Sequence, residues 1–250
     1  MAGHSKWKQI KRQKAVVDAK RATIFTKLGR EITVAARQGG SDPTANPRLR
    51  LAFQKAREQN MPMDIIERAL AKAAGSADAS QLEEIIYEGY GPSGTAILVE
   101  AMTDNRNRTV AEIRSLFNKG GGNLGEAGSV AWLFSTRGVI SIPTSEGVDP
   151  DEASLAAIDA GAEDFNIDDD LLSIYTKPEQ VESVRQALEG LGYKPSSSEI
   201  DKLPATTVSL KEADAVKTLR LLDRLEDLED VQKVYSNADF PEEVLASYAG

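Results

Sequence analysis

The residues best suited to chemistry lie in the first fourteen positions, and the chemistry they suit is the binding of polyanions. Cations fall at Lys6, Lys8, Lys11, Arg12 and Lys14 with no acid between them, and the aromatic Trp7 lies among them. Such clusters hold phosphate groups, and an aromatic ring can stack on a base.

Two ordinary explanations compete with this hypothesis. Trp7 could pack on the helices that follow, and for this residue alone the two interpretations are equally good. The lysines could form a solvated face, but a merely soluble surface mixes both signs of charge, so for the cations we favour binding.

The charge of the chain is divided between two regions. Residues 1–74 contain 16 lysines and arginines against 6 acids, a net of +10, whereas the remaining residues contain 14 bases against 33 acids, a net of −19. The overall net charge of −9 therefore hides a basic region joined to an acidic one.

Composition excludes several classes of site. The chain has no cysteine and a single histidine, His4, which removes disulfides, cysteine zinc sites and HExxH motifs. No apolar run approaches the roughly 18 residues that cross a membrane, and no apolar segment follows the first charges. We expect a cytoplasmic, non-enzymatic protein with no cofactor, no metal, no membrane contact and no small-molecule substrate; a monomer is the default guess.

The first 74 residues predict three amphipathic helices, beginning near Asp18, Pro47 and Pro62. In the first of them, apolar residues recur at steps of three and four, while Lys20, Lys27 and Arg30 fall on the opposite side. The sequence therefore predicts a small helical domain with a basic outer surface.

The rest of the chain predicts an α+β fold. Segments 139–142, 152–160, 163–167, 172–176, 178–191 and 197–202 read as β, α, β, β, α, β, which is the ferredoxin-like order. The flanking segments 94–102, 107–118, 129–135, 206–210, 211–228 and 231–236 repeat that order, with 83–90 as an extra edge strand.

We therefore predict three domains: a basic three-helix domain and two ferredoxin-like domains, the second inserted in the first. The expected limits are 1–77 for the nucleic-acid-binding domain, 78–136 together with 204–240 for the first ferredoxin-like domain, and 137–203 for the inserted one.

Three further motifs lie in the acidic region. Arg106 and Arg108 offer a second contact for nucleic acid, and Asn107 is expected to cap the helix they begin. The glycine-rich run 118–129 lacks a P-loop ending and is expected to mould to a partner, with a plain linker as the alternative. Residues 168–170 are three aspartates that could hold a divalent ion, but such a turn usually faces water.

Several long segments resemble the YebC/PmpR family over essentially the full chain. They are MAGHSKWKQIKRQK at 1–14, NPRLRLAFQKAREQNMP at 46–62, EGYGPSGTAILVE at 88–100, TDNRNRT at 103–109 and GGNLGEAGSVAWLF at 121–134. The family includes the mitochondrial translational activator of cytochrome oxidase subunit one. The resemblance implies a three-domain cytoplasmic protein without known enzymatic activity, described either as a DNA-binding transcriptional regulator or as a ribosome-associated factor that contacts ribosomal RNA and eases stalls at proline-rich stretches.

The leading hypothesis is thus a non-enzymatic regulator that binds nucleic acid, either ribosomal RNA on the ribosome or promoter DNA. The acidic region slightly favours RNA, because it is a poor neighbour for a long duplex and could face basic ribosomal proteins. A metal-dependent enzyme and a protein adaptor are the other classes considered. The candidate nucleic-acid-binding residues are His4, Lys6, Trp7, Lys8, Lys11, Arg12, Lys14, Lys20, Lys27, Arg30, Arg106 and Arg108.

Overall fold

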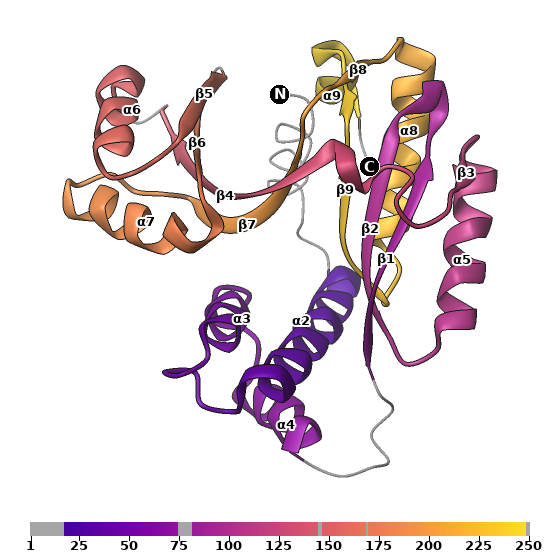
Figure 1. Ribbon diagram of the computed structural model, residues 1–250, viewed down its shortest axis with the longest axis horizontal. Coiled ribbons are helices and arrows are strands. Elements are labelled where there is room, and N and C mark those ends of the chain that lie inside the picture. The colour runs from indigo at the N-terminus through magenta and orange to yellow at the C-terminus, as the bar shows by residue number, and fades with distance from the viewer. Residues whose placement is uncertain (1–17, 75–81, 145–146, 169, 249–250) are drawn as a thin grey trace.

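The computed structural model describes residues 18–74, 82–144, 147–168 and 170–248. Figure 1 shows a helical region followed by two sheets, each carrying two helices. The expected α+β class is confirmed, as is a helical region ahead of two sheet-containing domains.

The helical region consists of α2 (Asp18–Gly39), α3 (Pro47–Glu58) and α4 (Met63–Ala74). Apolar stripes meet in a core around the fully buried Ile32, Leu49 and Ile66. Asn46 fixes the corner between α2 and α3: its side-chain oxygen accepts the Leu49 N–H at 3.1 Å, while its amide donates to two carbonyl oxygens at the end of α2 and just after it. The three amphipathic helices were predicted correctly.

The first sheet has the strand order β3-β1-β2-β9, formed by β1 (Glu83–Tyr90), β2 (Ala96–Thr103), β3 (Asn123–Leu124) and β9 (Val231–Ser236). Helices α5 (Arg106–Lys119) and α8 (Glu212–Glu226) cover one face, where Phe117, Leu222 and Val234 lie in the core. The short α9 (Glu242–Ser247) packs on α8.

Three expectations about this sheet are wrong. Segment 83–90 is an inner strand, because β1 pairs with β2 along its whole length on one side and with β3 on the other. Segment 129–135 contains the 3-10 turn Ala131–Leu133 before β4 begins. The strand expected at 206–210 shrinks to β8 (Val208–Ser209), which pairs with β10 (Ala238–Asp239) outside the sheet.

The second sheet has the order β5-β6-β4-β7, formed by β4 (Phe134–Pro143), β5 (Asp164–Asp168), β6 (Leu171–Thr176) and β7 (Ser197–Pro204). Helices α6 (Pro150–Asp159) and α7 (Val181–Gly190) cover one face of it. Chain order and strand order are both those of the ferredoxin-like fold, as predicted.

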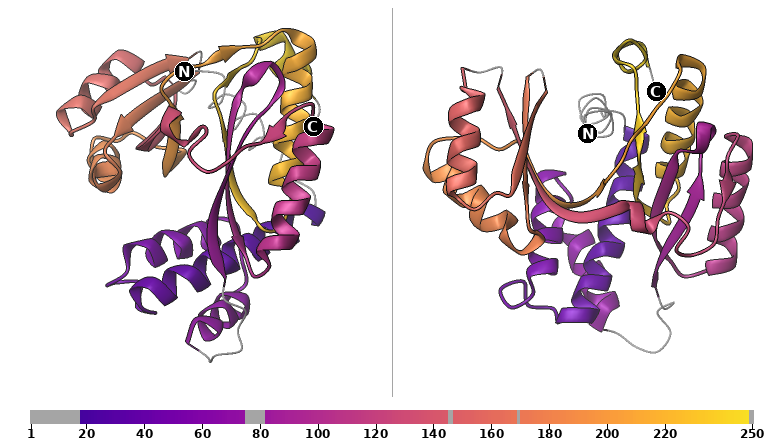
Figure 2. Two further views of the ribbon diagram at one scale, coloured as in Figure 1. Left: turned by 45° about the vertical axis from the view of Figure 1, so that its right-hand side comes forward. Right: turned by 45° about the horizontal axis from the view of Figure 1, so that its top comes forward.

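Strands β4 and β7 also connect the two sheets. They pair antiparallel from Phe134 and Pro204 to Ser141 and Ser197, and this ribbon crosses from one sheet region to the other (Figure 1). In Figure 2 the helices of both regions lie on the outside and the two sheets turn their other faces toward each other. The helical region lies at one end, beside β1 and β2.

Candidate nucleic-acid interface

Most of the predicted binding residues lie outside the part of the chain that the structure describes. These are His4, Lys6, Trp7, Lys8, Lys11, Arg12 and Lys14. Lys20 belongs to α2, where only its backbone is described. The described candidates are Lys27, Arg30, Arg106 and Arg108.

Lys27 and Arg30 attach α2 to the first sheet region. The Lys27 ammonium donates to the carbonyl oxygen of Glu226, at the C-terminal end of α8, where a cation is favoured by the helix dipole. The Arg30 guanidinium donates to the carbonyl oxygens of Glu229 at 2.7 Å and Met102 at 3.2 Å. Both side chains therefore make contacts between regions of the protein itself.

Arg30 and Arg108 meet on one buried carboxylate, Asp230. Arg30 Nη1 lies 2.6 Å from Asp230 Oδ1, and Arg108 Nη2 lies 2.8 Å from Oδ2. The hydroxyls of Thr109 and Thr103 donate to the same Oδ2 at 2.5 and 3.1 Å. The structure thus brings together two candidates that are far apart in sequence.

These contacts determine the charge state of Asp230, whose residue is only 4% exposed. Burial alone would raise the pKa of its carboxyl, but the hydrogen bonds from Arg108 and Thr109 and the charge of Arg30 outweigh burial and lower it. Asp230 is therefore a paired anion that joins α2, α5 and the turn before β9.

A second ion-pair group reinforces the same joint. The Arg48 guanidinium binds Glu84 of β1 at 2.5 Å and Glu31 of α2 at 2.9 Å, and the amide of Gln38 donates to Glu84 at 2.8 Å. The hydrogen bond to Glu84 is the main reason that the pKa of Arg48 is raised. Half-exposed pairs of this kind orient the helical region more than they stabilise it.

Helix α5 carries more positive charge than the sequence analysis recognised. Arg106 and Arg108 are exposed in its first turn, and Arg114 and Lys119 are exposed further along, with Glu112 as its single acid. The excess of basic over acidic residues between positions 106 and 119 is the sequence signal that indicates this charge. Its N-cap is Asn105, whose side chain accepts the Arg108 N–H at 3.1 Å, so the expectation for Asn107 is wrong.

The glycine-rich segment is fixed to β1, and the expectation that it moulds to a partner remains a prediction. Both carboxylate oxygens of Glu88 take part, accepting backbone N–H groups of Gly128, Val130 and Ala131, each at 2.7 Å. A side chain at Gly122 would come within 2.2 Å of the Tyr90 carbonyl oxygen, so only glycine allows this close approach. Glu88 was not recognised as important from the sequence.

The Glu88 contacts also present an aromatic ring to solvent. Trp132 follows the three donor residues and is 74% exposed, while its indole N–H donates to the Ser129 carbonyl oxygen at 3.1 Å. The ring is thus held at its base with its faces open. The sequence analysis assigned it no role.

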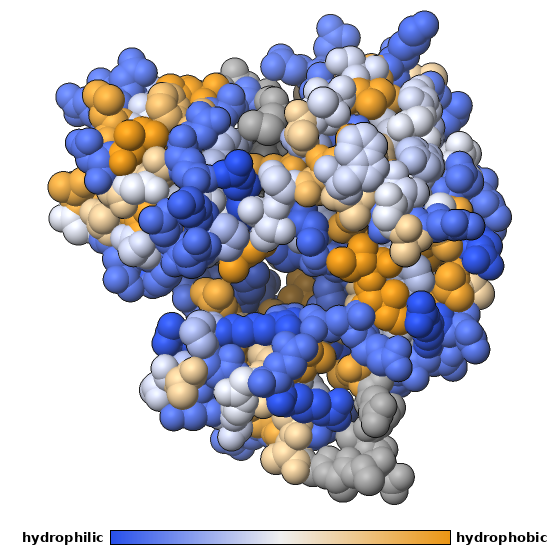
Figure 3. Space-filling view, viewed as in Figure 1, coloured by the Kyte–Doolittle hydropathy of each residue, from blue (hydrophilic) through white to orange (hydrophobic). Residues whose placement is uncertain are grey.

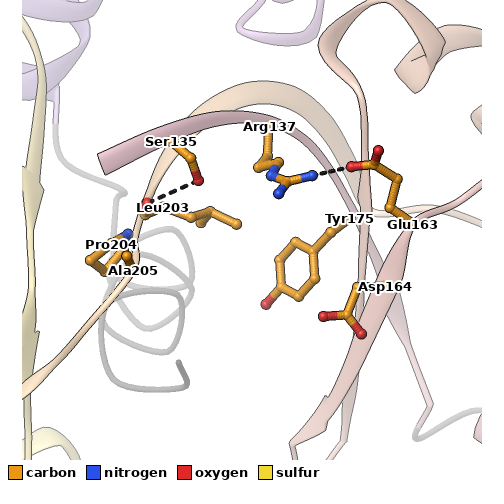
Figure 4. Close-up of a pocket in the computed structure, with 8 residues that line it drawn as sticks. All are labelled: Ser135, Arg137, Glu163, Asp164, Tyr175, Leu203, Pro204 and Ala205. Carbon is orange, nitrogen blue, oxygen red and sulfur yellow. Dashed lines mark hydrogen bonds and ion pairs between the residues drawn. The ribbon is translucent and has the colours of Figure 1, made fainter. Parts of the chain in front are cut away.

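A cavity of about 480 Å³ opens on the inner face of the second sheet (Figure 4). The Arg137 guanidinium pairs with Glu163 at its rim, and Tyr175 and Asp164 line one side opposite Leu203. Burial is the main reason that the pKa of Tyr175 is raised. The wall of the cavity is acidic, so it would repel a phosphate group.

The expected aspartate group is only partly described, because residue 169 lies outside the described residues. Within the described part of the chain, no three His, Cys, Asp or Glu side chains converge as a metal site. Among the described helices, none is long and apolar enough to cross a membrane.

The fold and the joint define a class: an α+β protein in which a basic helical region is held by ion pairs to the first of two sheet-containing regions, the second of which is ferredoxin-like. Residues 5–76 match the description "TACO1/YebC protein N-terminal domain", and residues 82–238 match "TACO1/YebC second and third domain". The chain belongs to the TACO1/YebC family.

Curated relatives and a solved structure agree with this assignment. A probable transcriptional regulatory protein of Dehalococcoides mccartyi is 54% identical over 99% of this chain and 98% of its own length. One of the same description from Herpetosiphon aurantiacus is 51% identical over 100% of this chain and 99% of its own. The crystal structure of a conserved hypothetical protein from Aquifex aeolicus superposes with a TM-score of 0.83 at 48% identity, covering 93% of this chain and 96% of that one.

Proposed function

We propose that this protein is a nucleic-acid-binding regulator of gene expression that acts on the ribosome, where it contacts ribosomal RNA and eases stalls at proline-rich stretches. The observation that carries the proposal is the separation of charge: a net of +10 in residues 1–74 against −19 in the rest. Polyanions bind to such concentrations of lysine and arginine largely through release of counterions.

The described residues support a binding surface on the outer side of the helical region. Arg37, Arg57 and Lys72 are exposed there, one on each of its three helices. Lys27 and Arg30 make contacts inside the protein, so their share in this proposal is to position the helical region. Direct contacts are assigned to the cluster from Lys6 to Lys14 with His4 and Trp7, to Lys20, and to Arg106 on α5. Arg108 contributes only through the part of its side chain that its pairs with Asp230 and Asp104 leave exposed.

A DNA-binding transcriptional regulator is the second candidate. The names of the curated relatives favour it, since they are called probable transcriptional regulatory proteins. The acidic sheet regions favour RNA on the ribosome, because basic ribosomal proteins would complement them, whereas a long duplex would be repelled. A cytoplasmic location and a monomeric state belong to the same proposal.

The deciding experiment is crosslinking in cells followed by sequencing of the bound nucleic acid. The variant is Lys8→Glu with Lys11→Glu and Arg12→Glu. The matched control is Lys177→Glu with Lys194→Glu and Lys211→Glu, which makes the same change of charge at exposed positions of the acidic regions. Ribosomal RNA recovered at one locus from wild type and control, but not from the variant, is the expected result.

Three other outcomes have definite meanings. Recovery of discrete promoter DNA would replace the ribosomal proposal with the transcriptional one. Equal recovery from the variant and wild type would contradict both, and activity that survives deletion of residues 1–74 would indicate an enzyme or an adaptor.

Salt dependence provides an independent check on purified protein and the recovered nucleic acid. Neutralising about 6 to 10 phosphates should weaken binding by roughly 10³ to 10⁵ between 50 and 200 mM salt. A nearly flat dependence would exclude the basic cluster as the main contact.

A further inference from the structure

The two edges of the second sheet differ in how they are covered. At the β7 edge, the Lys233 ammonium donates to the Ile200 carbonyl oxygen at 2.7 Å, and β9 lies alongside. At the other edge, β5 pairs with β6 on one side and has no strand on its outer side among the described residues. Open edges are templates for strand addition unless charged side chains, proline or bulges block them. The β5 sequence, DFNID, has no proline, and its two charged residues, Asp164 and Asp168, oppose an acidic strand but are complementary to a basic one.

The side chains of β5 alternate between two chemical characters. Phe165 and Ile167 point to the helix-covered face and remain 38% and 40% exposed. Phe165 and Ile167 therefore form a short apolar strip along the edge, and Leu155 and Ile158 on α6, which contacts β5, are also exposed, at 66% and 41%. In Figure 3 apolar side chains gather over this part of the molecule.

The opposite face of β5 is acidic. On that face Asp164, Asn166 and Asp168 alternate with the apolar pair. Asp164 also lines the cavity of Figure 4 beside the Tyr175 ring, where Glu163 already neutralises Arg137. A carboxylate next to an aromatic ring accommodates an ammonium or guanidinium group.

We propose that the β5 edge binds an extended segment of a partner protein in which apolar and basic residues alternate. The segment adds a fifth strand to the sheet, its apolar side chains cover the strip of Phe165 and Ile167, and one of its basic side chains enters the cavity at Asp164. The interaction is separate from nucleic-acid binding by the helical region.

The negative charge of β5 favours a basic partner segment over a second copy of this chain at the β5 edge. If two β5 strands paired antiparallel about Asn166, Asp164 of each would lie opposite Asp168 of the other, and like charges directly opposite are unfavourable. Nucleic acid is disfavoured on the same ground. A basic strand places opposite charges at both positions.

The test uses the full-length protein and a ten-residue peptide in which lysine or arginine alternates with valine or isoleucine. Amide hydrogen exchange measured with and without the peptide should show new protection confined to β5. A peptide of the same composition with its basic and apolar residues in separate blocks should bind at least tenfold more weakly, because it cannot present one face of each kind.

Two variants and a control make the result specific. Phe165→Lys with Ile167→Lys should weaken binding at least tenfold, whereas Leu191→Lys, which changes a more exposed apolar residue of the same region, should not. Asp164→Lys leaves the apolar strip intact and should shift preference toward a peptide in which glutamate alternates with valine. Thermal unfolding of each variant checks that the fold is retained.

Equal binding by the Phe165→Lys, Ile167→Lys variant and the Leu191→Lys control would overturn the proposal, as would protection elsewhere than β5. Protection of β5 that rises with protein concentration in the absence of peptide would assign the edge to a second copy. Protection by single-stranded RNA would assign it to nucleic acid.

Discussion

Asp230 and Glu88 are both buried carboxylates with lowered pKa values, but the groups that compensate them differ. Asp230 receives two guanidinium groups from α2 and α5, whereas Glu88 receives three backbone N–H groups from one loop. Backbone donors are fixed by the local chain path, while Arg30 and Arg108 must be brought together by two separate elements. The Glu88 site is therefore a local clamp, and the Asp230 site is a joint that depends on the arrangement of domains.

The largest expected effect comes from removing the local clamp. Glu88→Ala leaves three partly or fully buried N–H groups without their acceptor and should lower the opening free energy of residues 128–131 by about 3 kcal/mol. Amide hydrogen exchange of this segment measures the change. Glu126→Ala, an exposed acid in the same loop, is the control and should have little effect. Unchanged exchange in Glu88→Ala would show that the clamp does not hold the loop.

A smaller effect is expected at the joint. Asp230→Asn keeps the shape but removes the charge, and should cost about 2 kcal/mol in the stability of α2, because Arg30 retains its bonds to two carbonyl oxygens. Amide hydrogen exchange of α2 measures this loss of stability. Added salt should narrow the difference between this variant and wild type, since Arg108 is half exposed, and should leave the effect of Glu88→Ala unchanged.

The control at the joint is Asp104→Asn, which removes only the exposed partner of Arg108. It should change α2 exchange by less than about 0.5 kcal/mol. An Asp104 effect as large as the Asp230 effect would mean that the buried carboxylate is not the centre of the joint.

The smallest expected effect is the contribution of each carboxylate to the loss of folding stability at low pH. For Glu88, as for Asp230, burial alone would raise the pKa, but the hydrogen bonds lower it from ordinary values of 4.5 and 3.8 respectively. A lowered folded pKa stabilises the protein above the ordinary value, and that stability is lost as the pH falls through the folded pKa. Glu88→Gln and Asp230→Asn should therefore each flatten the fall of stability as the pH drops below the ordinary pKa, 4.5 for Glu88 and 3.8 for Asp230, measured by thermal unfolding. Parallel curves for wild type and variants would contradict the lowered pKa values.

How much the sequence predicted depended on how local each interaction was. The order of strands in the second sheet was predictable, because its elements follow one another without interruption. The position of β1 within the first sheet was not predictable. Alternating apolar and polar residues show that a strand is half buried, but they do not show which strand lies beside it. The assumed limits of the three domains remain predictions.

The candidate site was limited in the same way. The helical period placed Lys27 and Arg30 opposite the apolar stripe of α2. It could not show whether these side chains face solvent or contact another region of the protein. The carbonyl oxygen of Glu226 and the carboxylate of Asp230 are about 200 residues away in sequence. Glu88 escaped notice because a carboxylate in an exposed-looking strand carries no sign of its backbone donors.

The pairing of Phe134 with Pro204 makes the inserted sheet a removable module. The points where the chain leaves the first sheet region and returns to it are neighbours across a strand pair, so a short turn could join them without moving either. Insertion at such a point adds a whole folding unit while leaving the host's termini where they were.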